Sequence, residues 1–97
     1  MAQRRVAVAW FSPQSFAEAK WRGAEDLPAE FEDWRAAAER EIAELRSKGV
    51  EVAKVDLAPA ELSAWCRDNN RPIDAAARVI FAAITLIERE QGRPAPF

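Results

Sequence analysis

The pattern of apolar and polar positions predicts two short β-strands. Residues 4–10 form the first strand, and this run is apolar on both faces from Val6 onward, which is typical of a strand that is buried or nearly so. Residues 50–55 largely alternate between apolar and polar side chains, which is typical of a strand with one face covered. We therefore expect two strands that lie far apart in the sequence.

Helix-boundary residues and helical periodicity indicate two helices between these strands. Ser12 can cap a short helix over 13–21, Pro13 suits the first helical position, and Gly23 ends the helix. A longer helix is expected over 28–48. The apolar residues that recur along it at three- and four-residue steps are Phe31, Trp34, Ala38, Ile42 and Leu45.

Two more helices are expected after the second strand. Pro59 lies near the start of the third helix, and residues 68–70 end it, because Asn tolerates the left-handed conformation found at helix ends. Asp74 can cap a fourth helix over 75–90, which is apolar around much of its circumference and should be the central helix. Its expected apolar stripe consists of Ala76, Ala77, Ile80, Ala83, Ile84 and Ile87.

The order of these elements predicts an α/β fold of the type β-α-α-β-α-α, in which about four helices pack with a two-stranded sheet. Parallel strands joined by a right-handed crossover are favoured, because a long helical connection separates them. The helices over 28–48 and 75–90 carry the two strongest apolar stripes, so we expect them to pack against each other and to leave Trp34 and Trp65 mostly buried.

Length and composition predict one small domain of the cytoplasm. A chain of 97 residues has the usual size of a single domain, expected here over 1–91 with a disordered tail over 92–97. Cys66 is the only cysteine, so no internal disulfide can form, and the sequence lacks the pattern of a secretory signal. The apolar stretch 75–87 is too short to span a membrane.

The residue types needed for most kinds of catalytic and metal chemistry are missing. The chain has no histidine, which excludes Ser-His-Asp and Cys-His mechanisms and argues against a zinc site. Cys66 is expected to be a small core residue. The acidic residues Glu25, Asp26, Glu30, Glu32 and Asp33 gather around a helix N-terminus, where negative charge is favourable for structural reasons. We therefore predict no catalytic residue, no metal and no cofactor.

Charge and helix composition make a nucleic-acid partner an unfavoured alternative. The 14 basic and 16 acidic residues are interspersed and give a net charge of −2, so no basic face is expected. Residues 59–90 have the helix-turn-helix order of many DNA readers. The second helix of this unit, however, offers mainly Arg78 among apolar side chains.

A ligand site at the carboxyl ends of the strands is a second alternative. Open α/β sheets commonly bind ligands there. The candidate binding residues are Trp10, Ser12, Asp56, Arg71 and Arg78. Arg78 lies beside an apolar helix face, so we expect it to be partly buried and paired with a carboxylate. The carboxylates expected as its partner are Asp56, Asp68 and Asp74.

Several short motifs resemble those of a family of small bacterial proteins of unknown function. The motifs are Trp10-Phe11-Ser12, Trp34, Gly49-Val50-Glu51-Val52, Trp65-Cys66 and Ala77-Arg78. In that family a short strand with an aromatic-Phe-Ser step precedes a Trp-containing helix, a Gly-Val-x-Val-like strand and a helix that ends on Trp-Cys. The resemblance covers most of residues 6–81 and implies the same architecture, a bacterial source and no known activity.

The function favoured by the sequence is that of a non-enzymatic binding or protein-interaction module. The strand over 4–10 contains no proline and carries charge only at one end, so its edge can pair with another strand. An antiparallel homodimer through this strand would give a four-stranded sheet. The competing expectation is that the helix over 12–21 or the tail covers the edge.

Overall fold

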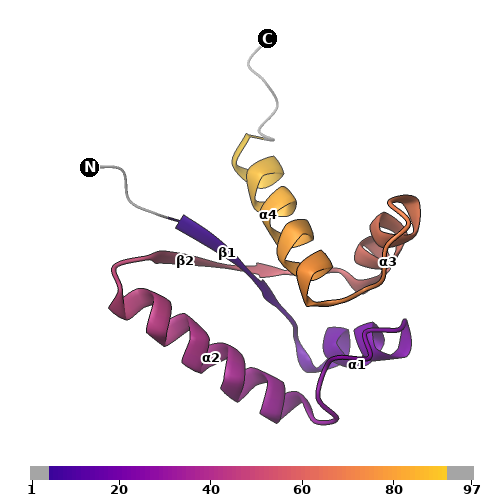
Figure 1. Ribbon diagram of the computed structural model, residues 1–97, viewed down its shortest axis with the longest axis horizontal. Helices are drawn as coiled ribbons and strands as arrows, with labels where there is room; N and C mark the ends of the chain where they lie inside the picture. The colour runs from indigo at the N-terminus through magenta and orange to yellow at the C-terminus, as the bar shows by residue number, and fades with distance from the viewer. Residues whose placement is uncertain (1–4, 92–97) are drawn as a thin grey trace.

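The computed structural model describes residues 5–91, which form two strands and four helices (Figure 1). Their order is β1 (Arg5–Trp10), α1 (Pro13–Trp21), α2 (Phe31–Ser47), β2 (Glu51–Asp56), α3 (Pro59–Asp68) and α4 (Ala75–Gln91). The predicted β-α-α-β-α-α order is confirmed. The expected tail over 92–97 lies outside the described residues.

The two strands are parallel, as predicted, and pair along their whole length from Arg5 opposite Glu51 to Trp10 opposite Asp56. The amide of Leu57 donates to the Trp10 carbonyl at 3.0 Å. In a parallel ladder the N–H and C=O groups of one residue point to the same side, and the side alternates along the strand. The even-numbered residues of β1 therefore bond to β2. The odd-numbered residues Arg5, Ala7 and Ala9 point their backbone groups away from the sheet.

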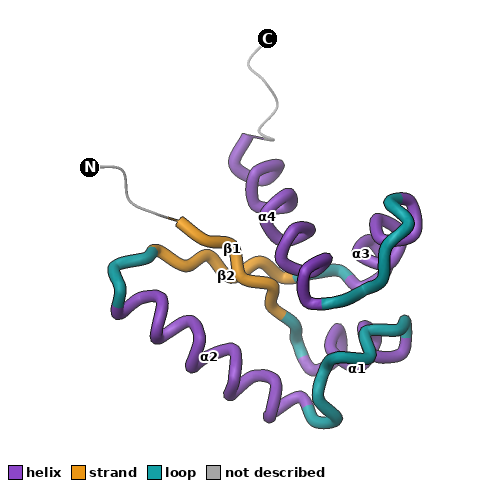
Figure 2. The backbone as a smooth tube through the Cα atoms, viewed as in Figure 1, coloured by secondary structure: helices purple, strands orange, loops and turns teal. Residues whose placement is uncertain are grey.

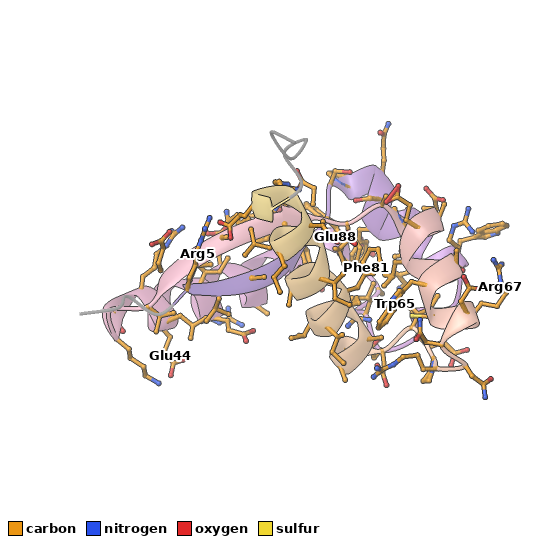
Figure 3. All side chains as sticks on the ribbon, turned by 90° about the horizontal axis from the view of Figure 1, so that it is seen from above. Arg5, Glu44, Trp65, Arg67, Phe81 and Glu88 are labelled. Carbon is orange, nitrogen blue, oxygen red and sulfur yellow. The ribbon has the colours of Figure 1, made fainter. Side chains whose placement is uncertain are left out.

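Helices α2 and α4 cover opposite faces of this sheet (Figures 1 and 2). Lys54 donates to Glu39 of α2 at 2.9 Å, so the even-numbered face is turned toward α2. Arg5 forms an ion pair with Glu90 of α4, so the odd-numbered face is turned toward α4. In the view from above, α4 lies on the near side of both strands (Figure 3). The predicted packing of the long helix against the fourth helix is therefore wrong, because the sheet separates them.

The core lies between the sheet, α1, α3 and α4, with helices α1 and α3 in contact near the carboxyl ends of the strands. The largest fully buried side chains of the described residues are Phe11, Ile42, Val55, Leu62 and Cys66. The buried alanines Ala19, Ala77 and Ala82 let neighbouring backbones approach closely. Burial of these groups provides the main favourable contribution to folding.

The predicted caps are present. Ser12 Oγ accepts a hydrogen bond from the Ser15 amide at 3.1 Å, and Ser15 Oγ accepts one from the Ser12 amide at 2.7 Å. Asp74 accepts from the Ala77 amide at 2.9 Å at the start of α4. Asn70, with φ of 56°, follows α3 in the left-handed conformation.

Helix α2 begins at Phe31, three residues after the predicted start at Pro28. The Pro28 carbonyl accepts a hydrogen bond from Lys20 Nζ of α1 at 2.9 Å, so this group is used by a tertiary contact and not by a helical amide. Glu30 then occupies the N-cap position without a side-chain cap. The acidic residues Glu32 and Asp33 lie in the first turn, where the prediction placed them.

The buried face of α4 differs from the predicted stripe. Ala77, Arg78 and Ala82 are buried, whereas Ala76, Ile80 and Ile87 are exposed. Helix α4 packs on both strands and on α3, so its central position is confirmed. The stripe was misplaced because apolar residues surround much of this helix and the pattern alone does not select a face.

Candidate functional site

The most deeply buried charge of the described residues is Arg78, which forms a two-pronged ion pair with Asp26. Arg78 Nη1 donates to Asp26 Oδ1 at 2.9 Å and Nη2 donates to Oδ2 at 2.6 Å. Nη1 also donates to the Ile73 carbonyl at 3.3 Å. Burial and pairing of Arg78 are confirmed. The predicted partners Asp56, Asp68 and Asp74 are wrong, because Asp26 in the connection between α1 and α2 takes that place.

The negative charge of Asp26 balances the positive charge of the buried Arg78 guanidinium. The hydrogen bonds from Arg78 hold the pKa of Asp26 below its ordinary value, despite the opposing effect of burial. Asp26 was predicted to belong to an acidic cluster at a helix N-terminus, and this assignment is wrong for Asp26. The pair carries no net charge while Asp26 is ionised.

Trp10 is the first of the remaining candidates, and its side chain makes packing contacts in the structure. Its ring centroid lies 5.0 Å from that of Trp34, and Lys54 Nζ lies 4.0 Å from its ring centroid. Lys54 in turn pairs with Glu39 at 2.9 Å. The hydrogen bond from Lys54 lowers the pKa of Glu39. This arrangement fixes α2 on the sheet.

Arg71 is also used structurally. Its guanidinium carbon lies 5.6 Å from the ring centroid of Trp65, and Trp65 packs against Phe81 of α4 at 5.6 Å between centroids (Figure 3). Within residues 5–91, Arg71 Nε is enclosed and has no hydrogen-bond partner. Trp34 and Trp65 are each only partly buried, so the prediction that both are mostly buried is too strong.

Ser12 and Asp56 do not complete a site with the other candidates. Ser12 caps α1, and Asp56 ends β2 as an exposed carboxylate. Of the five predicted binding residues, only Arg78 lines the groove described next. The ligand site predicted at the carboxyl ends of the strands stays a prediction.

A groove of about 440 Å³ follows the free edge of β1. It contacts residues 6–9 of β1, and four consecutive residues reach both faces of a strand only at its edge. The other edge of β1 is bonded to β2, so the groove lies along the outward backbone groups of Ala7 and Ala9. No α1 residue lines the groove, so the helix over 12–21 does not cover this edge. The tail over 92–97, the other part of that alternative, lies outside the described residues.

The walls of the groove come from the two helices on opposite faces of the sheet. One wall belongs to α2 and the other to α4. The α2 wall consists of Trp34, Ala38, Glu41 and Leu45, and the α4 wall of Ala75, Arg78 and Val79. The four α2 residues are spaced by four, three and four positions, which places them on one side of that helix. Trp34, Ala38 and Leu45 belong to the apolar stripe that was predicted to be a core face, whereas Glu41 does not.

Cys66 is a core residue, as predicted, with 1% of its surface exposed. Burial raises the pKa of its thiol, with a smaller opposing effect from Arg71. We expect an aromatic disulfide reagent at neutral pH to label Cys66 only when the protein opens, so labelling should be slow in buffer and fast in urea. Rapid labelling in buffer would contradict the burial of this thiol.

Residues 5–91 lack the features of a metal site and of a membrane span. No group of three or more Cys, Asp or Glu side chains there could hold a metal ion. No helix in this part of the chain is long and apolar enough to cross a membrane.

Comparison with known proteins adds no relative. No family model, curated protein or solved structure matches this chain. The resemblance to a family of small bacterial proteins therefore stays a prediction, and the groove along β1 carries the functional argument.

Proposed function

We propose that this protein is a non-enzymatic interaction module that binds through the free edge of β1, and that the occupant of the groove is β1 of a second copy. The observation that carries the proposal is the pair of outward backbone positions, Ala7 and Ala9, along the floor of an open groove. A strand in this groove would add to the sheet by main-chain hydrogen bonds.

The exposed edge favours a strand as the occupant. Unpaired N–H and C=O groups on an edge strand are a template for further pairing, and β1 has no proline to prevent it. A two-stranded sheet is also marginal by itself. A second pair of strands would convert the sheet into a four-stranded one.

The symmetry of β1 favours a second copy. In an antiparallel pair about Ala7, Ala7 lies opposite Ala7 and Arg5 lies opposite Ala9, so outward-pointing residues meet each other. The two arginines are then at opposite ends of the interface and do not repel. A two-fold axis through the sheet also places α2 beside α2 on one face and α4 beside α4 on the other.

The chemistry of the walls suits this occupant. Arg78 is neutralised by Asp26, which leaves Glu41 as the exposed charge among small and apolar wall residues. Ala38 and Ala75 leave space beside the strand edge. A groove whose walls are largely apolar and whose floor offers main-chain amides and carbonyls suits an extended strand.

The proposal predicts that Ala7→Pro abolishes dimerisation and preserves the fold. The amide of Ala7 points away from β2, so proline removes a donor only from the free edge and fills that edge with its ring. We expect wild-type protein to sediment as a dimer at micromolar concentration and Ala7→Pro to sediment as a monomer with an unchanged circular dichroism spectrum.

Val8→Pro is the matched control. The Val8 amide faces β2, so this variant loses a ladder hydrogen bond and should lose stability as well as the dimer. A wild-type protein that stays monomeric throughout the micromolar range would overturn the proposal. An Ala7→Pro variant that remains a dimer would overturn it as well.

A further inference from the structure

Glu41 is the one charged side chain on the α2 wall of the groove. It is exposed, and the wall residues beside it are Trp34, Ala38 and Leu45. Each of the other glutamates of α2 forms an ion pair: Glu32 with Arg35, Glu39 with Lys54 and Glu44 with Lys48. Glu41 has no such partner within residues 5–91, so its charge acts on whatever occupies the groove.

Glu41 lies at the level of Ala7 along β1. Helix α2 runs opposite to β1, because Trp34 in its first turn packs on Trp10 at the end of the strand. The helix rises by about 10 Å from Trp34 to Glu41. The strand spans about 10 Å from Trp10 back to Ala7. The two positions are therefore side by side.

A second contact between α2 and the sheet gives the same alignment. Lys54 lies opposite Val8 in the sheet and pairs with Glu39 of α2 at 2.9 Å. Glu41 is about 3 Å further along the helix, toward the start of β1. Ala7 is about 3.3 Å further along the strand in the same direction. Both contacts therefore place Glu41 beside the centre of the proposed strand pairing.

We infer that Glu41 of each copy faces Glu41 of the other across the two-fold axis and that these like charges set the strength of the dimer. This inference rests on the proposed pairing of β1 about Ala7. An axis through Ala7 and perpendicular to the sheet places the two α2 helices side by side and antiparallel. A residue at the level of the axis then meets its own copy, and on the groove side of α2 that residue is Glu41.

The surroundings of Glu41 make its charge effective. Like charges that approach each other across an interface weaken it, and the penalty grows as water is excluded from them. Ala38 and Leu45 flank Glu41 on the groove side of α2, so the two carboxylates approach each other between apolar side chains. The strand pairing favours association, whereas Glu41 opposes it.

The test combines wild-type protein with the charge-reversal variant Glu41→Lys. Each protein alone brings two like charges to the axis, but a mixed dimer brings opposite charges together. We expect an equimolar mixture to sediment with more dimer than either protein alone at the same total concentration. The dissociation constant of the mixed dimer should be about fivefold lower than that of the wild-type dimer.

Glu61→Lys is the matched control for the change in net charge. Glu61 is exposed on α3, a helix that does not line the groove. A mixture of Glu61→Lys with wild type should contain the average of the dimer fractions of the two separate proteins. An equal gain in this mixture and in the Glu41→Lys mixture would overturn the inference, because net charge would then explain both.

The outcomes separate this inference from the proposed function. If wild type is a dimer and Ala7→Pro is a monomer, but Glu41→Lys adds no dimer to the mixture, the Glu41 contact is overturned and the β1 interface stands. A gain that persists when both mixed chains also carry Ala7→Pro would overturn the contact at the β1 axis. A wild-type protein that stays monomeric overturns both the inference and the proposed function.

Discussion

Replacement of Trp34 by alanine should lower the free energy of unfolding by about 3 kcal/mol, the lower end of the range for deleting a large aromatic side chain. Trp34 joins α2 to the sheet and α1 through four aromatic neighbours. Their ring centroids lie 5.0 to 6.0 Å away, and the neighbours are Trp10, Phe11, Phe16 and Phe31. The lower end is expected because Trp34 is partly exposed in the groove.

Thermal melting at one fixed protein concentration measures this effect. A loss of this size corresponds to a fall in Tm of roughly 12 °C or more for a domain of this length. Trp21→Ala is the matched control, because Trp21 is 81% exposed and its loss should change stability by less than about 0.5 kcal/mol. Similar melting temperatures for the two variants would show that the aromatic cluster does not hold α2 in place.

The elements of the fold were predictable because local residues define them. Ser12 forms the expected cap of α1, Asp74 that of α4, and Asn70 takes the left-handed conformation after α3. The parallel direction of the strands follows from the long helical connection between them. Such signals act over a few residues, so the sequence reveals them without knowledge of the tertiary structure.

The faces of the helices were less predictable. In α4 the pattern favoured a stripe through Ile80 and Ile87, yet both are exposed and the sheet contacts a different side. Alanine occurs on both sides of this helix, so its pattern does not identify the buried face. The apolar stripes of α2 and α4 predicted that these helices pack against each other. The sheet lies between them, and local patterns do not reveal such an arrangement because it depends on the whole fold.

The candidate site was predicted in part. An edge of β1 that can pair with another strand was predicted from the absence of proline and from charge at one end only. The walls of the groove could not be predicted, because they depend on the positions of α2 and α4. The partner of Arg78 was missed because Asp26 is 52 residues away and no local pattern links them. Glu25 and Asp26 look alike in the sequence, and only the tertiary structure selects Asp26.

Asp26→Ala should lower the free energy of unfolding by about 3 kcal/mol, because it leaves the buried Arg78 guanidinium with the Ile73 carbonyl as its one remaining acceptor within residues 5–91. Asp26 is itself partly exposed, which keeps the loss at the lower end for a broken ion pair. Arg78→Met should cost less, since it removes the buried charge and keeps much of the volume. Urea unfolding of the single and double variants measures the coupling between the two residues.

The double variant Asp26→Ala/Arg78→Met decides whether the buried charge causes the loss. We expect it to be more stable than Asp26→Ala, because no unpaired cation remains in it. The pH dependence gives a further check. Because Arg78 lowers the pKa of folded Asp26, the pair stabilises the wild type fully above the pKa of the unfolded carboxyl, and this stability is lost as the pH falls below about 4. Asp26→Ala should lack that part of the acid sensitivity. Two results together would show that Asp26 does not stabilise Arg78 by its charge: a double variant no more stable than Asp26→Ala, and an Asp26→Ala variant whose stability depends on pH as that of the wild type does.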